Sequence, residues 1–210
     1  MTIKIVATSD THSKHKQVPI PDGDIFLHCG DLTPRGNHNE FISVGTWFES
    51  LKDRFKHRIM IAGNHDFSLM WNSRMILDNY FDKDVIYLED SGIELEGIKF
   101  YGSPWVPQFM NWAFMKLDHE LKPHWDAIPD DTDILITHGA PHGILDKYDD
   151  RHTGSQTLMK RIKELKLKHH IFGHLHEGYG DDIVDGVHYH NVAALNGEYQ
   201  YQNAPQIIEV

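Results

Sequence analysis

The chain has 210 residues, of which 40% are hydrophobic and 24% charged, the proportions of a globular protein with a substantial core. Its formal net charge of −11 disfavours binding of long duplex nucleic acid through a basic surface. No run approaches the roughly 18 apolar residues of a membrane helix, so no membrane partner is expected. The first residues lack a leader pattern and the one cysteine, Cys29, cannot form an internal disulfide, so the sequence predicts a cytoplasmic protein.

Apolar runs of β type alternate with helical candidates along the chain. Strands are expected in IKIVATSD, DIFLHCGD, HRIMIAGNHD, DILITHG and HHIFGHLH, and helices over about 40–55, 115–125 and 155–167. Two further segments predict hairpins that turn at Glu96-Gly97 and at Asp185-Gly186. This order, without repeats or linkers, predicts one α/β domain over residues 1–210 with mixed sheets.

Each of the five strands hands over to side chains of types that bind metals. The candidate ligands are Asp10, His12, Asp31, Asn64, His138, His174 and His176. Residues two apart in an extended segment point to the same side, so each D-x-H or H-x-H pair can converge on one point. Ligands of α/β folds collect outside the carboxyl ends of the strands, and five such strand ends therefore predict a single site.

The ligand types indicate the metals and the chemistry. Imidazole, carboxylate and amide ligands together suit Mn, Fe, Zn or Ni better than Ca or Mg, and Mn is the ion that we expect. Seven ligands exceed one tetrahedral site, which predicts two divalent ions about 3.5–4 Å apart with a bridging carboxylate. Such a pair binds phosphate and activates a bridging water, so that hydroxide attacks phosphorus in line. His65 remains free to protonate the leaving oxygen, and Asp66 either orients or charge-stabilises it or caps the following helix.

The blocks D-x-H, G-D, G-N-H-D, H-G and G-H-x-H, in this order, resemble the signature of the calcineurin-like metallophosphoesterase superfamily. The resemblance implies a four-layer αββα sandwich of two mixed β-sheets flanked by helices, with a dinuclear centre at the loop ends. It also implies His65 as the histidine that faces the substrate. The implied ligands of the first metal are Asp10, His12, Asp31 and His176, and those of the second are Asp31, Asn64, His138 and His174.

Longer stretches, among them FYGSPWVPQF, THGAPHGILD and NGEYQYQNAPQIIEV, are similar to the small phosphodiesterase branch that includes the brain 239FB-like proteins. Some members of that branch have glycine in place of His174, which weakens their second metal site. This chain keeps the histidine, which predicts a complete second site. The expected function is hydrolysis of phosphodiester bonds in a small phosphorylated substrate, with cyclic nucleotides as candidates.

Three residues are further candidates for substrate contacts. Arg35 lies four residues after Asp31, the offset at which protein phosphatases of the superfamily bind phosphate, and it could equally be a loop residue. His142 could contact substrate or face solvent in a turn. Trp105 begins an aromatic-rich stretch, residues 103–114, that could stack a nucleobase, pack in the core or form a dimer contact.

Other functions remain open at this point. A phosphomonoesterase or protein phosphatase would use the same core with Arg35 as a phosphate clamp, and a nuclease would act on short oligonucleotides. A non-catalytic scaffold is the least expected, because His65 is present. Eight histidines outside the blocks, among them His15, His169 and His170, are expected on the surface, and His28 is expected in the core.

Overall fold

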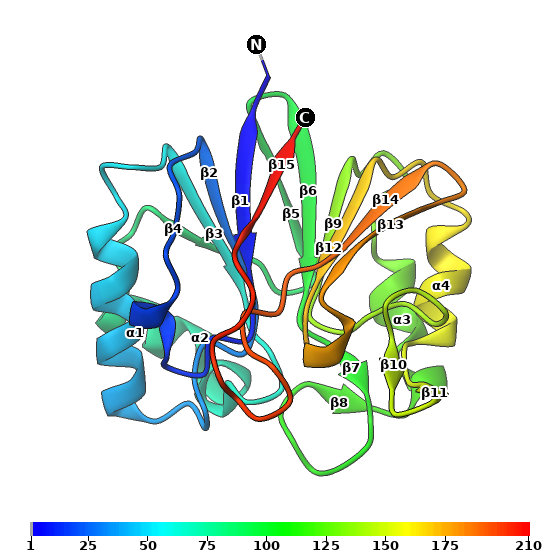
Figure 1. The fold of residues 1–210 in the computed structure, drawn as a ribbon, viewed down its shortest axis with the longest axis horizontal. Coiled ribbons are helices and arrows are strands. Elements are labelled where there is room, and N and C mark those ends of the chain that lie inside the picture. Colours follow the sequence, from blue (N-terminus) through cyan, green and yellow to red (C-terminus); the bar gives the residue numbers. More distant parts are fainter. Residues whose placement is uncertain (1) are drawn as a thin grey trace.

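The computed structural model describes residues 2–210 and contains two large β-sheets that face each other (Figure 1). The first sheet consists, in spatial order, of β15 (Gln206–Glu209), β1 (Lys4–Thr8), β2 (Ile25–Cys29), β3 (His57–Ile61) and β4 (Val85–Tyr87). The second consists of β13 (Gly180–Val184), β14 (Val187–Asn191), β12 (His169–Phe172), β9 (Ile134–Thr137), β6 (Ile98–Ser103) and β5 (Ser91–Leu95).

Helices cover the outer faces of both sheets. The first sheet carries α1 (His38–Ser50) and α2 (Phe67–Tyr80), and the second carries α3 (Lys122–Asp126) and α4 (Gln156–Ile162) (Figure 1). The predicted four-layer αββα sandwich of two mixed sheets is confirmed.

The directions of the parallel strands determine at which end of the molecule the predicted ligands lie. In the first sheet β1, β2, β3 and β4 run parallel, and in the second β6, β9, β12 and β14 do so, and the carboxyl ends of both sets meet at the lower end of the molecule in Figure 1. Strand β2 is buried at every residue, which explains its continuous apolar sequence. At the lower end lie two small sheets, β7 (Val106–Pro107) with β8 (Met115–Lys116) and β10 (Lys147–Tyr148) with β11 (Arg151–His152).

Both predicted hairpins are present. Strands β5 and β6 pair antiparallel around Glu96-Gly97, and β13 and β14 pair around Asp185-Gly186. Both residues of each dipeptide have positive φ, from 51° at Asp185 to 84° at Gly186. This is the backbone that a type I′ turn requires, so the turn residues determined the register of these strands.

The observed helices differ more from the predicted ranges than the strands do. The first predicted helix is confirmed, although it begins at the capping box of Asn37 and Glu40 and ends at Ser50. The third is confirmed over a shorter range, with Ser155 as its N-cap. The helix predicted over 115–125 is wrong apart from α3, because Pro123 suits the first turn of a helix and not its interior.

Helix α2 was expected only as an unbounded helix after Asp66, and two histidines that were expected on the surface are buried. Helix α2 is kinked at Asn72, whose backbone is not helical, and this weakens its apolar periodicity. His15 and His170 are fully buried, which corrects their expected surface position. Each ring behaves as a neutral apolar body with one polar contact, to Ser43 and to Thr137 respectively.

Across residues 2–210, none of the helices combines the length and the apolar character needed to cross a bilayer.

Candidate metal centre

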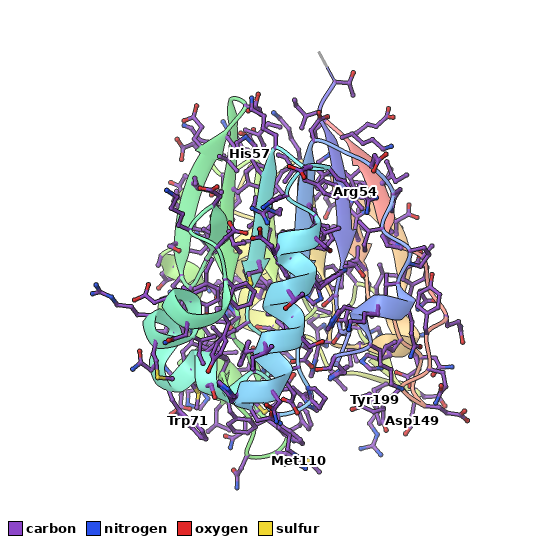
Figure 2. All side chains as sticks on the ribbon, turned by 90° about the vertical axis from the view of Figure 1, so that its left-hand side faces the viewer. Arg54, His57, Trp71, Met110, Asp149 and Tyr199 are labelled. Carbon is purple, nitrogen blue, oxygen red and sulfur yellow. The ribbon has the colours of Figure 1, made fainter. Side chains whose placement is uncertain are left out.

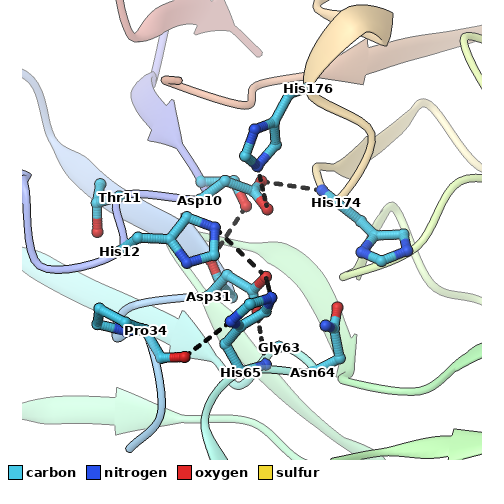
Figure 3. A network of polar contacts seen from close by, with 12 residues as sticks. Asp10, Thr11, His12, Asp31, Pro34, Gly63, Asn64, His65, His174 and His176 are labelled. Atoms are coloured by element: carbon cyan, nitrogen blue, oxygen red, sulfur yellow. Dashed lines mark hydrogen bonds and ion pairs between the residues drawn. The ribbon is translucent and has the colours of Figure 1, made fainter. Parts of the chain in front are cut away.

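The structure brings all seven predicted metal ligands together at the carboxyl ends of the parallel strands. The loops after β1, β2, β3, β9 and β12 contribute them, as the strand-end pattern predicts. Figure 3 shows His12, His174 and His176 placed around one space, with His12 on its left, His174 on its right and His176 above. The ligands gather because parallel strands of both sheets end at the same edge of the sandwich.

Two groups of side chains share this space. The first comprises Asp10, His12 and His176, the second comprises Asp31, His138 and His174, and within each group the ligand atoms lie within 4.8 Å of one another. Asp31 also faces the first group, because its Oδ2 lies 3.6 Å from Nε2 of His12 while its Oδ1 lies 3.4 Å from Nε2 of His138. One carboxylate is therefore placed to serve two ions. Asn64 Oδ1 lies 3.0 Å from Nε2 of His138 and adds an amide oxygen to the second group.

Backbone carbonyls orient two of the imidazoles. Nδ1 of His138 donates to the carbonyl of Cys29 (2.9 Å), and Nδ1 of His176 donates to the carbonyl of Asn196 (2.9 Å). Nε2 of each ring consequently points toward a carboxylate of the centre. Hydrogen bonds of this kind fix the tautomer and direction of metal-binding histidines in general.

Several buried polar atoms of the centre have no hydrogen-bond partner among residues 2–210. They include Oδ1 of Asp10 and both ring nitrogens of His12. Leaving such groups unpaired in an interior is unfavourable by roughly 1–3 kcal/mol each. A divalent transition ion would satisfy carboxylate oxygen and imidazole nitrogen together, so the donor set fits the metals expected from the sequence.

The charges of the centre are paired in the absence of metal. Burial alone would raise the pKa of Asp31, but the facing His138 keeps that pKa well below its usual range. Burial likewise opposes protonation of His138 and His176, yet the charges of Asp31 and Asp10 outweigh it and raise the pKa of each to about 9. Burial lowers the pKa of His12 to about 4. The imidazoles of His138 and His176 are therefore cations at neutral pH. Each must lose one proton before it can bind a metal ion.

The backbone of the centre is held in an uncommon conformation. Asp10, His12, Asp31 and His174 all have positive φ, between 41° and 68°. Strained residues of this kind cluster at functional sites, where the surroundings fix them. Gly173 shows how tightly the loops approach, since a Cβ there would lie 2.2 Å from Oδ2 of Asp10.

His65 lies at the edge of the centre, where one of its ring nitrogens is within 4.8 Å of ligand atoms of His12 and Asp31. Its Nδ1 donates to the carbonyl of Pro34 (2.8 Å), and its Nε2 lies 3.9 Å from Oδ2 of Asp31 (Figure 3). Its backbone N–H donates to the same carboxylate (2.8 Å). The ring stacks on Trp112 with centroids 4.2 Å apart. Nε2 is thus the ring nitrogen of His65 that is free to exchange a proton with a bound molecule.

Asp66 occupies the N-cap position of α2, but its side chain neither caps that helix nor orients His65. Its carboxylate makes no side-chain cap of α2 and accepts instead from the backbone N–H groups of Leu32, Thr33 and Gly63, and from the Thr33 hydroxyl. Pro34, not Asp66, orients the ring of His65. Asp66 therefore ties the loop after β2 to the loop after β3. Burial and the nearby Asp31 raise its pKa to about 6.

The sequence that carries these ligands is similar to that of known phosphoesterases. The sequence profile described as calcineurin-like phosphoesterase matches residues 3–178, which include all seven ligands. The chain is also 32% identical to the human metallophosphoesterase domain-containing protein 1, over 99% of this chain and 71% of the human protein. The chain belongs to the calcineurin-like phosphoesterase family. Members of this family use a dinuclear metal centre, and the structure offers the side chains for one.

Solved structures share the fold at low sequence identity. The TT1561 protein of Thermus thermophilus superposes with a TM-score of 0.60 at 12% identity, covering 91% of this chain and 89% of that one. A structure described as a novel archaeal phosphodiesterase superposes with a TM-score of 0.51 at 17% identity, covering 99% of this chain and 100% of that one. Both likenesses concern the fold.

A cavity of about 710 Å³ opens directly over the phosphoesterase centre. Its wall combines centre residues, among them His12, Asp31 and His65, with a largely apolar rim. The aromatic members of that rim are Phe109, Trp112, Tyr148 and Tyr199. In residues 2–210, no lysine or arginine lines this cavity. Figure 2 shows Met110 and Tyr199 at this end of the molecule, opposite Arg54 and His57.

The three weaker candidates do not line the cavity. Arg35 is exposed, and its guanidinium lies 5.4 Å from the centre of the Trp112 ring. His142 packs against His152. Trp105 is partly buried and packs against the core, and its indole N–H donates to Asp90 (3.0 Å). The prediction that these residues contact substrate is not supported by their positions.

Sequence reasoning missed one cavity residue that belongs to the centre's surroundings. The ring of Tyr199 lies 4.9 Å from that of His12 and 5.1 Å from that of His176, by their centroids. Tyr199 is in the late NGEYQYQ segment, whose likeness to the small phosphodiesterase branch was the available signal. Nothing in its spacing predicts that the segment returns to the site.

Metal binding should release protons at neutral pH. His138 and His176 are protonated below about pH 9 in the metal-free protein, so loading at pH 7 should release about two protons from them, and fewer as the pH approaches 9. Calorimetry in buffers of different ionisation enthalpy measures this release. His176→Gln should reduce it by about one proton. The matched change His12→Gln should leave it unaltered, since His12 is neutral at pH 7. Equal effects of the two substitutions would contradict the assigned charges.

Proposed function

We propose that this phosphoesterase hydrolyses phosphodiester bonds in small nucleotide-like molecules, with cyclic nucleotides as candidate substrates. Family membership supports metal-dependent hydrolysis of phosphoesters. The finer proposal is carried by one observation, the absence of lysine and arginine from the lining of the cavity within residues 2–210.

The charge of the substrate is the reason. A phosphomonoester carries close to two negative charges at pH 7, because its second pKa is about 6. A diester carries one. Without a guanidinium or ammonium group in the cavity, and with Glu177 in its wall, the second charge of a monoester would have no protein partner. The lining therefore favours the diester.

The aromatic rim supports an organic group on each side of the phosphorus. Phe109 lies beside His174, with ring centroids 5.6 Å apart, and Tyr199 lies beside His12. These histidines belong to different halves of the centre. Flat apolar surfaces next to both halves suit planar substituents such as nucleobases, which gain about 1–3 kcal/mol by stacking on an aromatic side chain.

The ligand roles remain those predicted from the sequence. Asp10, His12, Asp31 and His176 would hold the first ion, and Asp31, Asn64, His138 and His174 would hold the second. When bound, two such ions offset the phosphate charge and activate a water for in-line attack. Manganese is the ion that we propose, with iron, zinc and nickel as alternatives.

His65 would supply the proton for the leaving oxygen. It lines the cavity beside Asp31, and its Nδ1–H is engaged by the carbonyl of Pro34, so the proton to be transferred sits on Nε2. Stacking on Trp112 restrains the ring in this direction. Nε2 would thus deliver its proton to the leaving oxygen of a substrate bound in the cavity.

The position of Arg35 speaks against a phosphomonoesterase or protein phosphatase. Its guanidinium lies outside the cavity lining and over Trp112, so it does not form the phosphate clamp that these enzymes would need. The cytoplasmic location, the small-molecule partner and a homodimer stay predictions.

The diester preference is tested with two aryl esters. With Mn²⁺ present, kcat/KM for bis(p-nitrophenyl) phosphate should exceed that for p-nitrophenyl phosphate by at least about tenfold, equivalent to about 1.4 kcal/mol. Release of p-nitrophenol measures both rates. A variant that places a cation at the rim, Met110→Arg, should narrow the ratio. A wild-type preference for the monoester would overturn the proposal.

The role of His65 is tested by substitution and by the leaving group. His65→Ala should lower kcat by about 10²–10⁴-fold for an alkyl leaving group, the usual contribution of a general acid. The loss should be much smaller for p-nitrophenolate, which leaves without a proton. Manganese content, measured by mass spectrometry, should stay unchanged. An equal loss for both leaving groups would show that His65 does not donate the proton.

A further inference from the structure

A second cluster of histidines lies away from the catalytic centre. His169 begins β12, and His188 and His190 lie on the neighbouring strand β14. The register pairs His169 with His188, and one ligand nitrogen from each of the three rings lies within 4.8 Å of the other two. His169 and His174 stand at opposite ends of β12, which is extended over His169–Phe172 and spans roughly 10 Å.

The side-chain alternation of the sheet brings the three rings to one face. Tyr189, between the two histidines of β14, points to the helical side of the sheet, so His188 and His190 point to the other side. Ile171, two residues after His169, lies in the core between the sheets. The cluster therefore faces the first sheet, near its edge strand β15.

Hydrogen bonds leave one nitrogen of His190 available as a ligand. Its Nδ1 is 2.9 Å from Oε1 of Gln206, while Nε2 of Gln206 donates to the carbonyls of Gly180 and Asn191 (3.0 Å each). Because the amide N of Gln206 is used in this way, its Oε1 accepts and Nδ1 of His190 carries the proton. Nε2 of His190 consequently holds a lone pair, directed at His169. This is the arrangement in which proteins orient metal-binding imidazoles.

The spacing of the nitrogens matches a shared ion. Nε2 of His190 and Nδ1 of His169 lie 3.1 Å apart. Two imidazole nitrogens on one tetrahedral Zn²⁺, at Zn–N distances near 2.0–2.1 Å, are roughly 3.3 Å apart. The His188 ring is 4.1 Å from that of His190 by centroids, and one of its ring nitrogens lies within 4.8 Å of the ligand nitrogens of His169 and His190.

The surroundings favour a cation and give it access to solvent. Oδ2 of Asp181 lies 3.1 Å from Nε2 of His188, and the two side chains are 62% and 32% exposed. The nearest lysine in sequence, Lys168, is paired with Asp133 (2.8 Å). An ion could enter from the side of Asp181 without disturbing the core.

We propose that His169, His188 and His190 form a separate binding site for one divalent transition metal ion, with Asp181 as the adjacent carboxylate. Three imidazoles and a nearby carboxylate are a donor set typical of Zn²⁺. A bound ion would join β12, β14 and, through Gln206, the edge strand β15 of the other sheet. The site is independent of the phosphoesterase reaction and of the dinuclear centre.

Zinc titration of the full chain tests this site. The Asp31→Asn substitution removes the shared ligand of the dinuclear centre, so zinc bound there is weakened and the remaining tight site can be counted. In that background, calorimetry and mass spectrometry after dialysis should find one Zn²⁺ per chain. Adding His188→Ala should weaken that site at least about tenfold, since one of three ligands is lost.

The matched control is His119→Ala, which removes an exposed histidine elsewhere in the chain. It should leave zinc binding unchanged. His188→Gln, which preserves the size and polarity of the side chain, gives a second variant, and circular dichroism shows that each chain is folded. Zinc binding that is equal in the His188 variants and the His119 control would overturn the proposal, as would a folded Asp31→Asn chain without tight zinc.

Discussion

The carboxylate of Asp31 is the interaction on which the site depends. It is buried and ionised, and it faces His12 with one oxygen and His138 with the other. A buried charge is unfavourable unless opposite charges and hydrogen bonds compensate it. Here the compensation comes from protonated His138 in the metal-free protein, and the same geometry suits two cations. The charge state without metal and the capacity to bind metal thus have one cause.

The two-sheet architecture makes this arrangement possible. Asp31 follows a strand of the first sheet and His138 a strand of the second, and their side chains meet at the common end of both sheets. The apolar layer between the sheets holds the strands in place. The left-handed conformations of Asp10, His12, Asp31 and His174 are fixed by this frame, which is stable enough to maintain local strain.

Sequence patterns predicted the features that depend on neighbouring residues in the chain, such as strand ends and tight turns. The ligands could be identified because each follows a strand, and the turns at Gly97 and Gly186 could be identified because the required backbone favours glycine. Asp66 was misjudged because its partners, Leu32 and Thr33, lie 33–34 residues away in sequence and only the fold brings them near. Likewise, an aromatic run cannot show which ring enters the cavity.

The histidines illustrate both the local patterns that a sequence reveals and the long-range contacts that it does not. His174 and His176 follow one strand within a single short segment, so their presence at the same strand end could be deduced, although the left-handed backbone of His174 places the two rings in different halves of the centre. His169 and His190 meet across two strands and 21 residues, through a register that no local pattern specifies. The buried His170 was misjudged for a related reason, since its partner Thr137 lies 33 residues away on β9. Long-range pairing is therefore what the sequence alone left undetermined.

The manganese content of two single-residue variants tests the shared carboxylate most directly. If Asp31 serves both ions, Asp31→Asn should weaken both manganese ions together, whereas Asp10→Asn should weaken only the first. Titration with Mn²⁺, followed by the electron paramagnetic resonance signal of the free ion, gives the two affinities for each variant. An Asp31→Asn chain that keeps one manganese ion at the wild-type affinity would contradict the shared role of this carboxylate.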